Sequence, residues 1–172
     1  MTQIETPRLR LLALSLEQLQ HFDDDPGLLN SDLVVPVQPS VITPVVARAI
    51  RAKLAKMRLA SRRDHDWYTY WLIIRKDENL GIGLAGFKGR PNGRAEVEIG
   101  YGIAPEEQNQ GFMTEAARAL VNWALAQPVC GTVTAWTEKN NIASQRVLQK
   151  IGMVRSGEQN NQYFWIIKGG GA

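Results

Sequence analysis

One segment constrains the fold of this chain more than any other. In residues 98–116, a run of strand-forming residues ends at Pro105, a polar loop with a single glycine follows, and an alanine-rich helical pattern begins at once. The N–H groups at a helix start have no partner within the helix, and the helix dipole favours negative charge there. Because Gly111 has no Cβ, the backbone can approach a phosphate closely or adopt a positive φ. The spacing alone leaves two interpretations open, an anion site and an ordinary strand-to-helix turn.

The rest of the chain predicts a mixed sheet flanked by helices. A capping-box pattern from Ser15 predicts a short helix, and Thr43-Pro44 predicts the start of a longer one that runs to about residue 59. Residues 23–44 carry four prolines and no clear period, so we expect a loop there. Strands are predicted at residues 8–12, 67–74, 81–88, 94–103, 132–137, 154–158 and 162–167, and helices at residues 114–127 and 141–151. This order predicts an α+β fold in one domain, residues 1–168, with a disordered tail at residues 169–172.

The composition excludes several classes of protein. The net charge of +3 on 172 residues is too small to predict a nucleic-acid partner. The single cysteine, Cys130, excludes an internal disulfide and a cysteine-rich zinc site, so we expect no metal. No apolar stretch approaches the length of a membrane span, and the first residues lack the pattern of a signal peptide. We therefore expect a cytoplasmic protein that binds neither membrane nor nucleic acid.

Three stretches of the sequence resemble one family. The loop matches neither a Walker A loop nor a Rossmann fingerprint, but residues 108–113 resemble the Gln/Arg-x-x-Gly-x-Gly/Ala motif of GNAT acetyltransferases. Residues 111–116 are similar to the variant found in ribosomal-protein N-acetyltransferase-like members, and residues 5–11 match the usual start of that subgroup. Residues 140–153 are similar to the family's Asn-x-x-Ser-x-x-x-Leu-x-Lys-x-Gly-Phe helix. Met113 departs from the motif, since the family has a small residue at that position.

The resemblance implies a GNAT-like fold, with a mostly antiparallel sheet that splays open between the strand ending at Ile103 and the strand at residues 132–137. Acetyl-CoA would lie in the split, with its pantetheine along the first strand and its pyrophosphate on the N–H groups of the loop. Asn141 would bind the pantetheine arm, although its residue type is also that of a helix N-cap. The implied cofactor-binding residues are Ile103, Gln108, Asn109, Gln110, Gly111, Phe112, Met113, Thr114 and Asn141.

The implied reaction is acetyl transfer from acetyl-CoA to an amine, either a protein N-terminus or a small molecule. Many GNAT enzymes carry a tyrosine as acid seven residues after the helix asparagine, whereas this chain has Leu148 there. Ser144 is the candidate substitute, unless its hydroxyl bonds within its own helix. Glu98 is the candidate base and Glu96 the reserve, because both project to the same side of the strand. Each carboxylate also fits a solvated surface position.

The missing tyrosine leaves a second function open, a non-catalytic acyl-CoA-binding sensor. The sequence also leaves the oligomeric state open, a homodimer included. Two other features have plain structural interpretations. The basic face of the helix at residues 43–59 is expected to be solvated, and the aromatic cluster at residues 67–71 is expected in the core and at the sheet edge.

Overall fold

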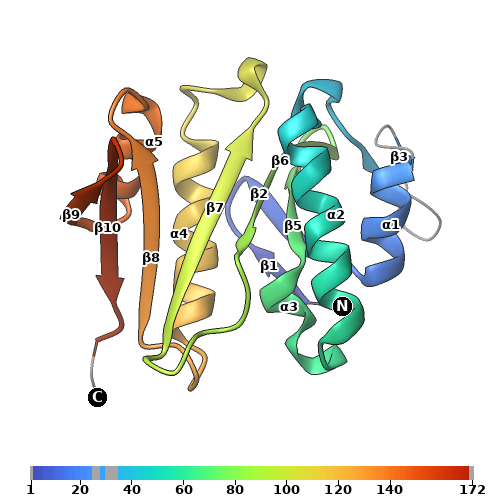
Figure 1. Cartoon of the computed structure of the whole chain (residues 1–172). Coiled ribbons are helices and arrows are strands. Elements are labelled where there is room, and N and C mark those ends of the chain that lie inside the picture. The colour runs from blue at the N-terminus through green and yellow to red at the C-terminus, as the bar shows by residue number, and fades with distance from the viewer. Residues whose placement is uncertain (1, 25–27, 30–34, 171–172) are drawn as a thin grey trace.

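A single eight-stranded sheet forms the centre of the computed structural model, which describes residues 2–24, 28–29 and 35–170. Its strand order is β1-β2-β5-β6-β7-β8-β10-β9 (Figure 1). The strands of this sheet are β1 Gln3–Glu5, β2 Leu9–Ala13, β5 Tyr70–Arg75, β6 Leu80–Phe87, β7 Glu96–Ile103, β8 Thr132–Glu138, β9 Val154–Gln159 and β10 Gln162–Lys168. The α-helices are α1 Leu16–Asp24, α2 Pro44–Leu59, α3 His65–Tyr68, α4 Phe112–Leu125 and α5 Ile142–Lys150. The mixed fold with a mostly antiparallel sheet, predicted from the sequence, is confirmed.

Helices cover both faces of the sheet, so β5 is buried from Trp71 to Ile74 and β6 from Gly81 to Phe87. On β2 and β5, alternate residues point to opposite faces. Leu11 and Ile73 belong to the core beneath α4 and α5, whereas Leu12 and Leu72 belong to the core beneath α1 and α2. All four are fully or almost fully buried. Each such side chain contributes roughly 1.5–3 kcal/mol to stability.

The predicted helix starts form as the sequence indicated. The Ser15 hydroxyl accepts the N–H of Gln18 at 3.1 Å, and the Gln18 side chain accepts the N–H of Ser15 at 2.9 Å, which completes the capping box. At α2, the Thr43 hydroxyl accepts the N–H of Val46 at 3.3 Å, and Pro44 occupies the first helical position. Both helices pack on the same face of the sheet.

Three sequence predictions need correction. The strand predicted at residues 67–74 begins only at Tyr70, because residues 65–68 form the short helix α3, in which Trp67 is buried in the core. The loop predicted at residues 23–44 contains the end of α1, the two-residue strands β3 (Leu28–Leu29) and β4 (Val35–Pro36), and the 3₁₀ turn η1 (Pro39–Val41). Within this stretch, residues 25–27 and 30–34 lie outside the described residues. Strand β1, which extends the sheet by pairing with β2, was not predicted.

The sheet opens between β7 and β8. These strands form the one parallel pair of the sheet among the described residues, and their pairing covers only Glu96 to Glu98. Beyond that point β7 continues to pair with β6 as far as Ile103, while β8 pairs with β10. In Figure 1 the two strands lie together at their lower ends and diverge toward the top. The predicted split between them is confirmed.

The predicted disordered tail is described only in part. Residues 171–172 lie outside the described residues, whereas Gly169 donates its N–H to the carbonyl of Gly131 at 2.9 Å. Of the helices in the described ranges, none combines the length and apolarity that a bilayer crossing demands.

Candidate acetyl-transfer site

The N-terminus of α4 is open toward the split in the sheet. Gly111 occupies the N-cap position with φ of 82° and ψ of 0°, the left-handed conformation that glycine adopts without strain. No side chain caps the first turn. The first N–H groups of α4 therefore remain available to an anion, with the helix dipole behind them. This geometry agrees with an anion site, which stays a prediction.

Arg8 fixes the position of this loop. Its Nη1 donates to the carbonyl of Gln110 at 2.9 Å, and its Nε donates to the carboxylate of Glu115 at 2.7 Å. Its guanidinium also lies 4.5 Å from the centre of the Phe112 ring, a cation–π contact. The Glu115 carboxylate additionally accepts from the hydroxyl of Thr6 at 2.6 Å. The segment that precedes β2 thus holds the glycine loop in place.

A cavity of about 410 Å³ lies between this loop and α5. Most of the cofactor-binding residues predicted from the sequence line it: Ile103, Gln108, Asn109, Gly111, Phe112, Met113, Thr114 and Asn141. Gln110 does not, because its side chain turns back to donate to the carbonyl of Glu106 at 3.2 Å. Arg146 and Lys150 also line the cavity and were not predicted. They stand four residues apart on α5, so they share one helix face and bring two positive charges to the site.

Asn141 serves as the N-cap of α5. Its Oδ1 accepts the N–H of Ser144 at 3.0 Å. The amide nitrogen of an asparagine in this role retains two donors. Because Asn141 also lines the cavity, capping does not prevent its amide from contacting a ligand there.

Tyr101 and Ser144 meet at the edge of the same cavity. The phenol oxygen of Tyr101 lies 2.9 Å from the Ser144 Oγ and also donates to the Ser144 carbonyl at 3.3 Å. Burial raises the pKa of Tyr101 to about 12, and the hydrogen bond with Ser144 opposes part of that rise. The phenol therefore stays protonated at neutral pH. The alternative that the Ser144 hydroxyl bonds only within its own helix is wrong.

Leu148 occupies the family's tyrosine position and is fully buried in the core. It carries no group that can exchange a proton. The group that could serve as the acid in its place is the Tyr101 phenol, which comes from β7 instead of α5. Tyr101 was not predicted from the sequence because it lies in a strand, where an aromatic residue is expected for packing alone.

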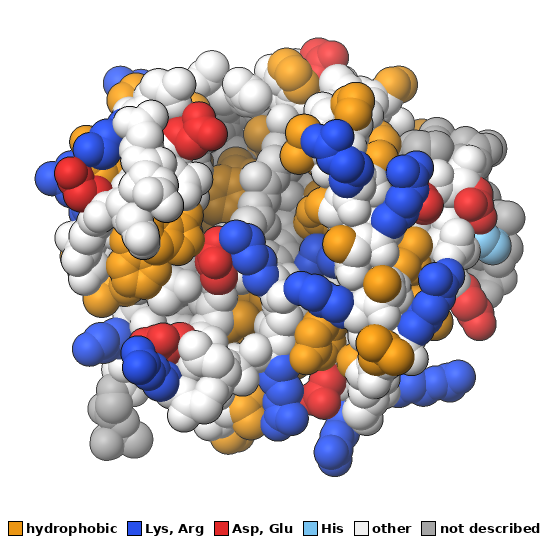
Figure 2. Space-filling model, viewed as in Figure 1, with side chains coloured by type: hydrophobic (Ala, Val, Ile, Leu, Met, Phe, Trp, Pro, Cys, Tyr) orange, Lys and Arg blue, Asp and Glu red, His pale blue; other side chains and the backbone are white. Residues whose placement is uncertain are grey.

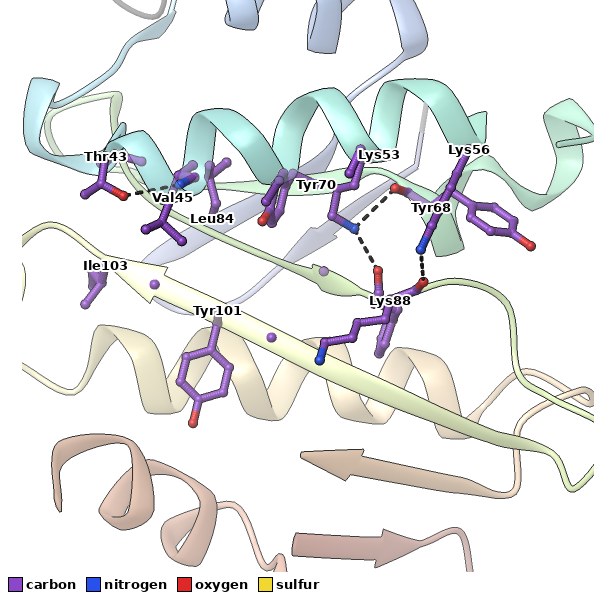
Figure 3. A pocket seen from close by; sticks show the side chains of 18 of the residues that line it. Thr43, Val45, Lys53, Lys56, Tyr68, Tyr70, Leu84, Lys88, Tyr101 and Ile103 are labelled. Carbon is purple, nitrogen blue, oxygen red and sulfur yellow. Dashed lines mark hydrogen bonds between the residues drawn. The ribbon is translucent and has the colours of Figure 1, made fainter. Parts of the chain in front are cut away.

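A second cavity, of about 530 Å³, lies between α2 and β7 (Figures 2 and 3). Its walls are largely apolar and include Val45, Val46 and Leu84. Tyr68 and Tyr70 line it as well, so the aromatic cluster predicted for the core and sheet edge divides between core and cavity. The alternating glycines of β7, Gly100 and Gly102, form part of its floor, and an added Cβ at either would meet no atom within 4 Å.

The two cavities share a short stretch of β7. Tyr101, Gly102 and Ile103 line both of them. This stretch lies beyond the end of the β7–β8 pairing, where the sheet has opened. A ligand along the split and a ligand between α2 and β7 would therefore meet there.

Lys53 is the most perturbed titratable side chain of the second cavity. Its Nζ donates to the carbonyls of Phe87, Thr69 and Tyr68 at 2.7, 3.1 and 3.2 Å. It also lies 4.6 Å from the centre of the Tyr70 ring. Burial, with a smaller contribution from the charge of Lys56, lowers the pKa of Lys53 from 10.5 to about 7. The three carbonyls and the ring favour the ammonium form and oppose that shift.

The candidate base Glu98 lies on β7 next to the second cavity but does not line it. Its carboxylate forms an ion pair with Lys88, which does line the cavity. Glu98 itself lines a further cavity, of about 470 Å³, beside Trp136. The reserve candidate Glu96 stands at the first position of β7 and lines neither the cavity beside α5 nor the cavity between α2 and β7.

Comparison with known proteins identifies the chain by sequence. A family model described as an acetyltransferase (GNAT) domain matches residues 8–154. The uncharacterized N-acetyltransferase YjdG of Bacillus subtilis strain 168 is 33% identical over 96 residues, which are 56% of this chain and 57% of YjdG. A second protein of that strain, the uncharacterized N-acetyltransferase YnaD, is 35% identical over 85 residues, 49% of each chain. The chain thus spans about half the length of these curated relatives.

Solved structures share the fold. RimL, a ribosomal L7/L12 alpha-N-protein acetyltransferase solved in complex with coenzyme A, superposes with a TM-score of 0.67 over 97% of this chain and 98% of its own, at 16% sequence identity. At this level of identity, the likeness shows a common fold.

Proposed function

The chain belongs to the GNAT acetyltransferase family, and from this premise we propose that it is an acetyl-CoA-dependent N-acetyltransferase acting on a primary amine. The observation that carries the proposal is the meeting of the two cavities at residues 101–103 of β7. The first cavity begins at the open N-terminus of α4, and the second lies between α2 and β7. Because the two cavities meet only at this stretch, a donor in the first and an acceptor in the second can be bound at the same time. We therefore propose direct attack in a ternary complex.

The residues of the first cavity fit acetyl-CoA. The uncapped first turn of α4 and the left-handed Gly111 suit a pyrophosphate. Arg146 and Lys150 supply positive charge opposite that turn. Beyond Glu98, the β7 edge that faces the split has no strand partner among the described residues, so its backbone groups can bond an extended pantetheine arm. The related fold of RimL, solved with coenzyme A, supports the same assignment.

Acetyl-CoA supplies an activated thioester carbonyl for the amine. In the proposal, the residues around the thioester hold acetyl-CoA and the amine in position. They also donate one proton to the sulfur and accept one from the amine. The Tyr101 phenol, kept protonated by its raised pKa and ordered by Ser144, donates to the departing sulfur. Glu98 accepts the proton of the amine, directly or through water, from the β7 face that carries Gly100 and Gly102. The apolar walls of the second cavity limit water around the reacting amine.

Calorimetry and a thiol-release assay test this function. We expect acetyl-CoA and CoA to bind and ATP not to bind, and we expect saturating acetyl-CoA to raise the Tm by mass action. A panel of primary amines with acetyl-CoA should then release free thiol. Binding without thiol release for any amine would favour the acyl-CoA-binding sensor. A folded sample that binds none of the CoA compounds would contradict the proposal.

A further inference from the structure

The charged residues that line the second cavity, which the proposal takes as the acceptor site, are all positive. Three lysines line it, Lys53, Lys56 and Lys88, and no Asp or Glu does so in the part of the chain that the structure describes. Figure 3 shows the three lysines together at one end of the cavity, with Val45 and Ile103 at the other. Lys and Arg side chains are also prominent around the hollow on this face in Figure 2. An ammonium group placed near the lysines would be repelled.

The three lysines differ in what they can offer a ligand. Lys53 directs its three N–H donors to backbone carbonyls and its pKa is lowered to about 7, so it is only partly charged at neutral pH and offers a ligand no hydrogen bond. Lys88 is exposed and paired with Glu98. Lys56 is exposed and donates to the carbonyl of Lys88 at 3.2 Å. An ammonium has three donors, and no carboxylate partner of Lys56 is found among the described residues, so Lys56 can bond an incoming anion.

The space between the lysines and the shared stretch of β7 is apolar. Leu84 and the ring of Tyr70 line it, whereas the ring of Tyr68 lies at the lysine end of the cavity. A cavity of about 530 Å³ lies within the usual range for small-molecule sites. The shape and chemistry fit an acceptor that has an apolar middle between two polar ends.

We propose that the acceptor carries an anionic group, a carboxylate or its equivalent, separated from the reacting amine by an apolar spacer, and that Lys56 binds that group. This inference rests on the proposed function, because it takes the second cavity as the acceptor site. The anion neutralises the lysine end of the cavity, and the amine is thereby directed to the opposite part, at residues 101–103.

A matched set of acceptors tests the inference. Aminohexanoate, hexylamine and diaminohexane have the same chain and differ only in the far group, which is anionic, neutral or cationic. In the thiol-release assay we expect kcat/KM to fall in that order, with aminohexanoate about tenfold above hexylamine, the effect of one charge-assisted hydrogen bond. Lys56→Gln should abolish this preference. Arg48→Gln removes one charge from the same helix outside the cavity and should retain it.

A second pair of acceptors identifies the source of the anion. Glycyl-glutamate amide and glycyl-glutamine amide both present a peptide N-terminus, and only the first carries a carboxylate. A higher kcat/KM for glycyl-glutamate amide than for aminohexanoate would assign the anion to an acidic polypeptide. The reverse order would assign it to a small amino acid. Either order supports an anionic acceptor, provided that Lys56→Gln lowers the rate with the preferred compound.

A binding measurement keeps the inference separate from the proposed function. Hexanoate lacks an amine, so its binding does not require turnover. Calorimetry should show hexanoate binding to the wild-type protein about tenfold more tightly than hexanol, with the difference lost in Lys56→Gln. If no amine releases thiol but this binding pattern holds, the proposed reaction fails and the anion site stands. Equal affinity for hexanoate and hexanol, or faster turnover of hexylamine than of aminohexanoate, would overturn the inference.

Discussion

Tyr101 and Ser144 are joined across the opening of the sheet, with the phenol oxygen 2.9 Å from the Ser144 Oγ. The first comes from β7 and the second from the first turn of α5. The pairing of β7 with β8 has already ended at Glu98, so this side-chain contact links the two walls of the split. In the proposed reaction, this protonated hydroxyl lies beside the cavity assigned to acetyl-CoA and protonates the departing thiolate.

Tyr101→Phe should lower kcat about tenfold and leave the affinity for acetyl-CoA nearly unchanged. The effect is modest because a thiol with a pKa near ~8.5 leaves without much assistance. Ser144→Ala should have a smaller effect on kcat, since it removes only the partner that orders the phenol. Steady-state kinetics with calorimetry for acetyl-CoA would check both variants. An unchanged kcat in Tyr101→Phe would restrict Tyr101 to packing.

Gly111→Ala should weaken acetyl-CoA binding more than it lowers stability. A side chain at φ of 82° is strained, by about 1–2 kcal/mol, and the added Cβ would lie 3.4 Å from Arg8 Nη2, which holds the loop. Gly152→Ala is the matched control, because Gly152 also has a positive φ, of 94°. Gly152 lines neither the cavity beside α5 nor the cavity between α2 and β7. Thermal unfolding and calorimetry should show similar losses of Tm in the two variants and a loss of affinity only in Gly111→Ala. Equal affinity losses would make Gly111 merely structural.

The sequence predicted the parts of the fold that depend on local signals. Helix α2 starts at Pro44 because Thr43, the N-cap, and Pro44, at the first helical position, are adjacent in the sequence. Gly111 could be singled out because a lone glycine directly before a helical pattern indicates a positive φ or a close backbone approach. Helix α3 was missed because Trp67 and Tyr68 have strand-like composition, and their burial against the core overrides that preference.

The cavities could not be predicted in the same way, because they depend on contacts between distant segments. Lys53 was not among the basic residues that we expected to be solvated, Arg48, Arg51, Arg58 and Arg62, and no sequence signal indicated that it donates to carbonyls of three residues from the segment 68–87. Arg8 reaches a loop more than a hundred residues away. Such pairs leave no periodic pattern in the sequence. The motif at residues 140–153 did contain Arg146 and Lys150, and their spacing on one helix face is a signal that could have identified them.

Glu98→Gln should lower kcat/KM, and raising the pH should restore part of the loss. General-base assistance is typically worth about 10² to 10⁴ in rate, and free hydroxide or direct ionisation of the amine replaces it as the pH rises. Glu96→Gln is the control, since Glu96 stands on the same strand and face but at the first position of β7, farther from the shared stretch at residues 101–103, and does not line the cavity beside Trp136 that Glu98 lines. Rates with a confirmed amine from about pH 6 to about pH 10 would separate the two variants. A pH profile of Glu98→Gln parallel to that of the wild type would remove Glu98 as the base.

Lys53 should make the stability of the protein depend on pH in the alkaline range. Its pKa falls from 10.5 to about 7 on folding, mainly through burial and secondarily through Lys56. Below about pH 7, Lys53 is protonated in both the native and the unfolded state, and the cost of burying its charge is fully present. Between about pH 7 and 10.5, the unfolded state binds more protons than the native state, so the free energy of unfolding rises with pH.

Lys53→Met tests this dependence directly. The wild type should gain about 1–3 kcal/mol relative to the variant between neutral pH and about pH 10, less than burial alone would give because three carbonyls hold the ammonium. Denaturant unfolding at a series of pH values measures the difference. Lys168→Met, at an exposed position at the end of β10, serves as the control and should follow the wild-type curve. If the curves of Lys53→Met and the wild type stay parallel, the carbonyls and the Tyr70 ring outweigh burial and Lys53 remains an ammonium throughout this range.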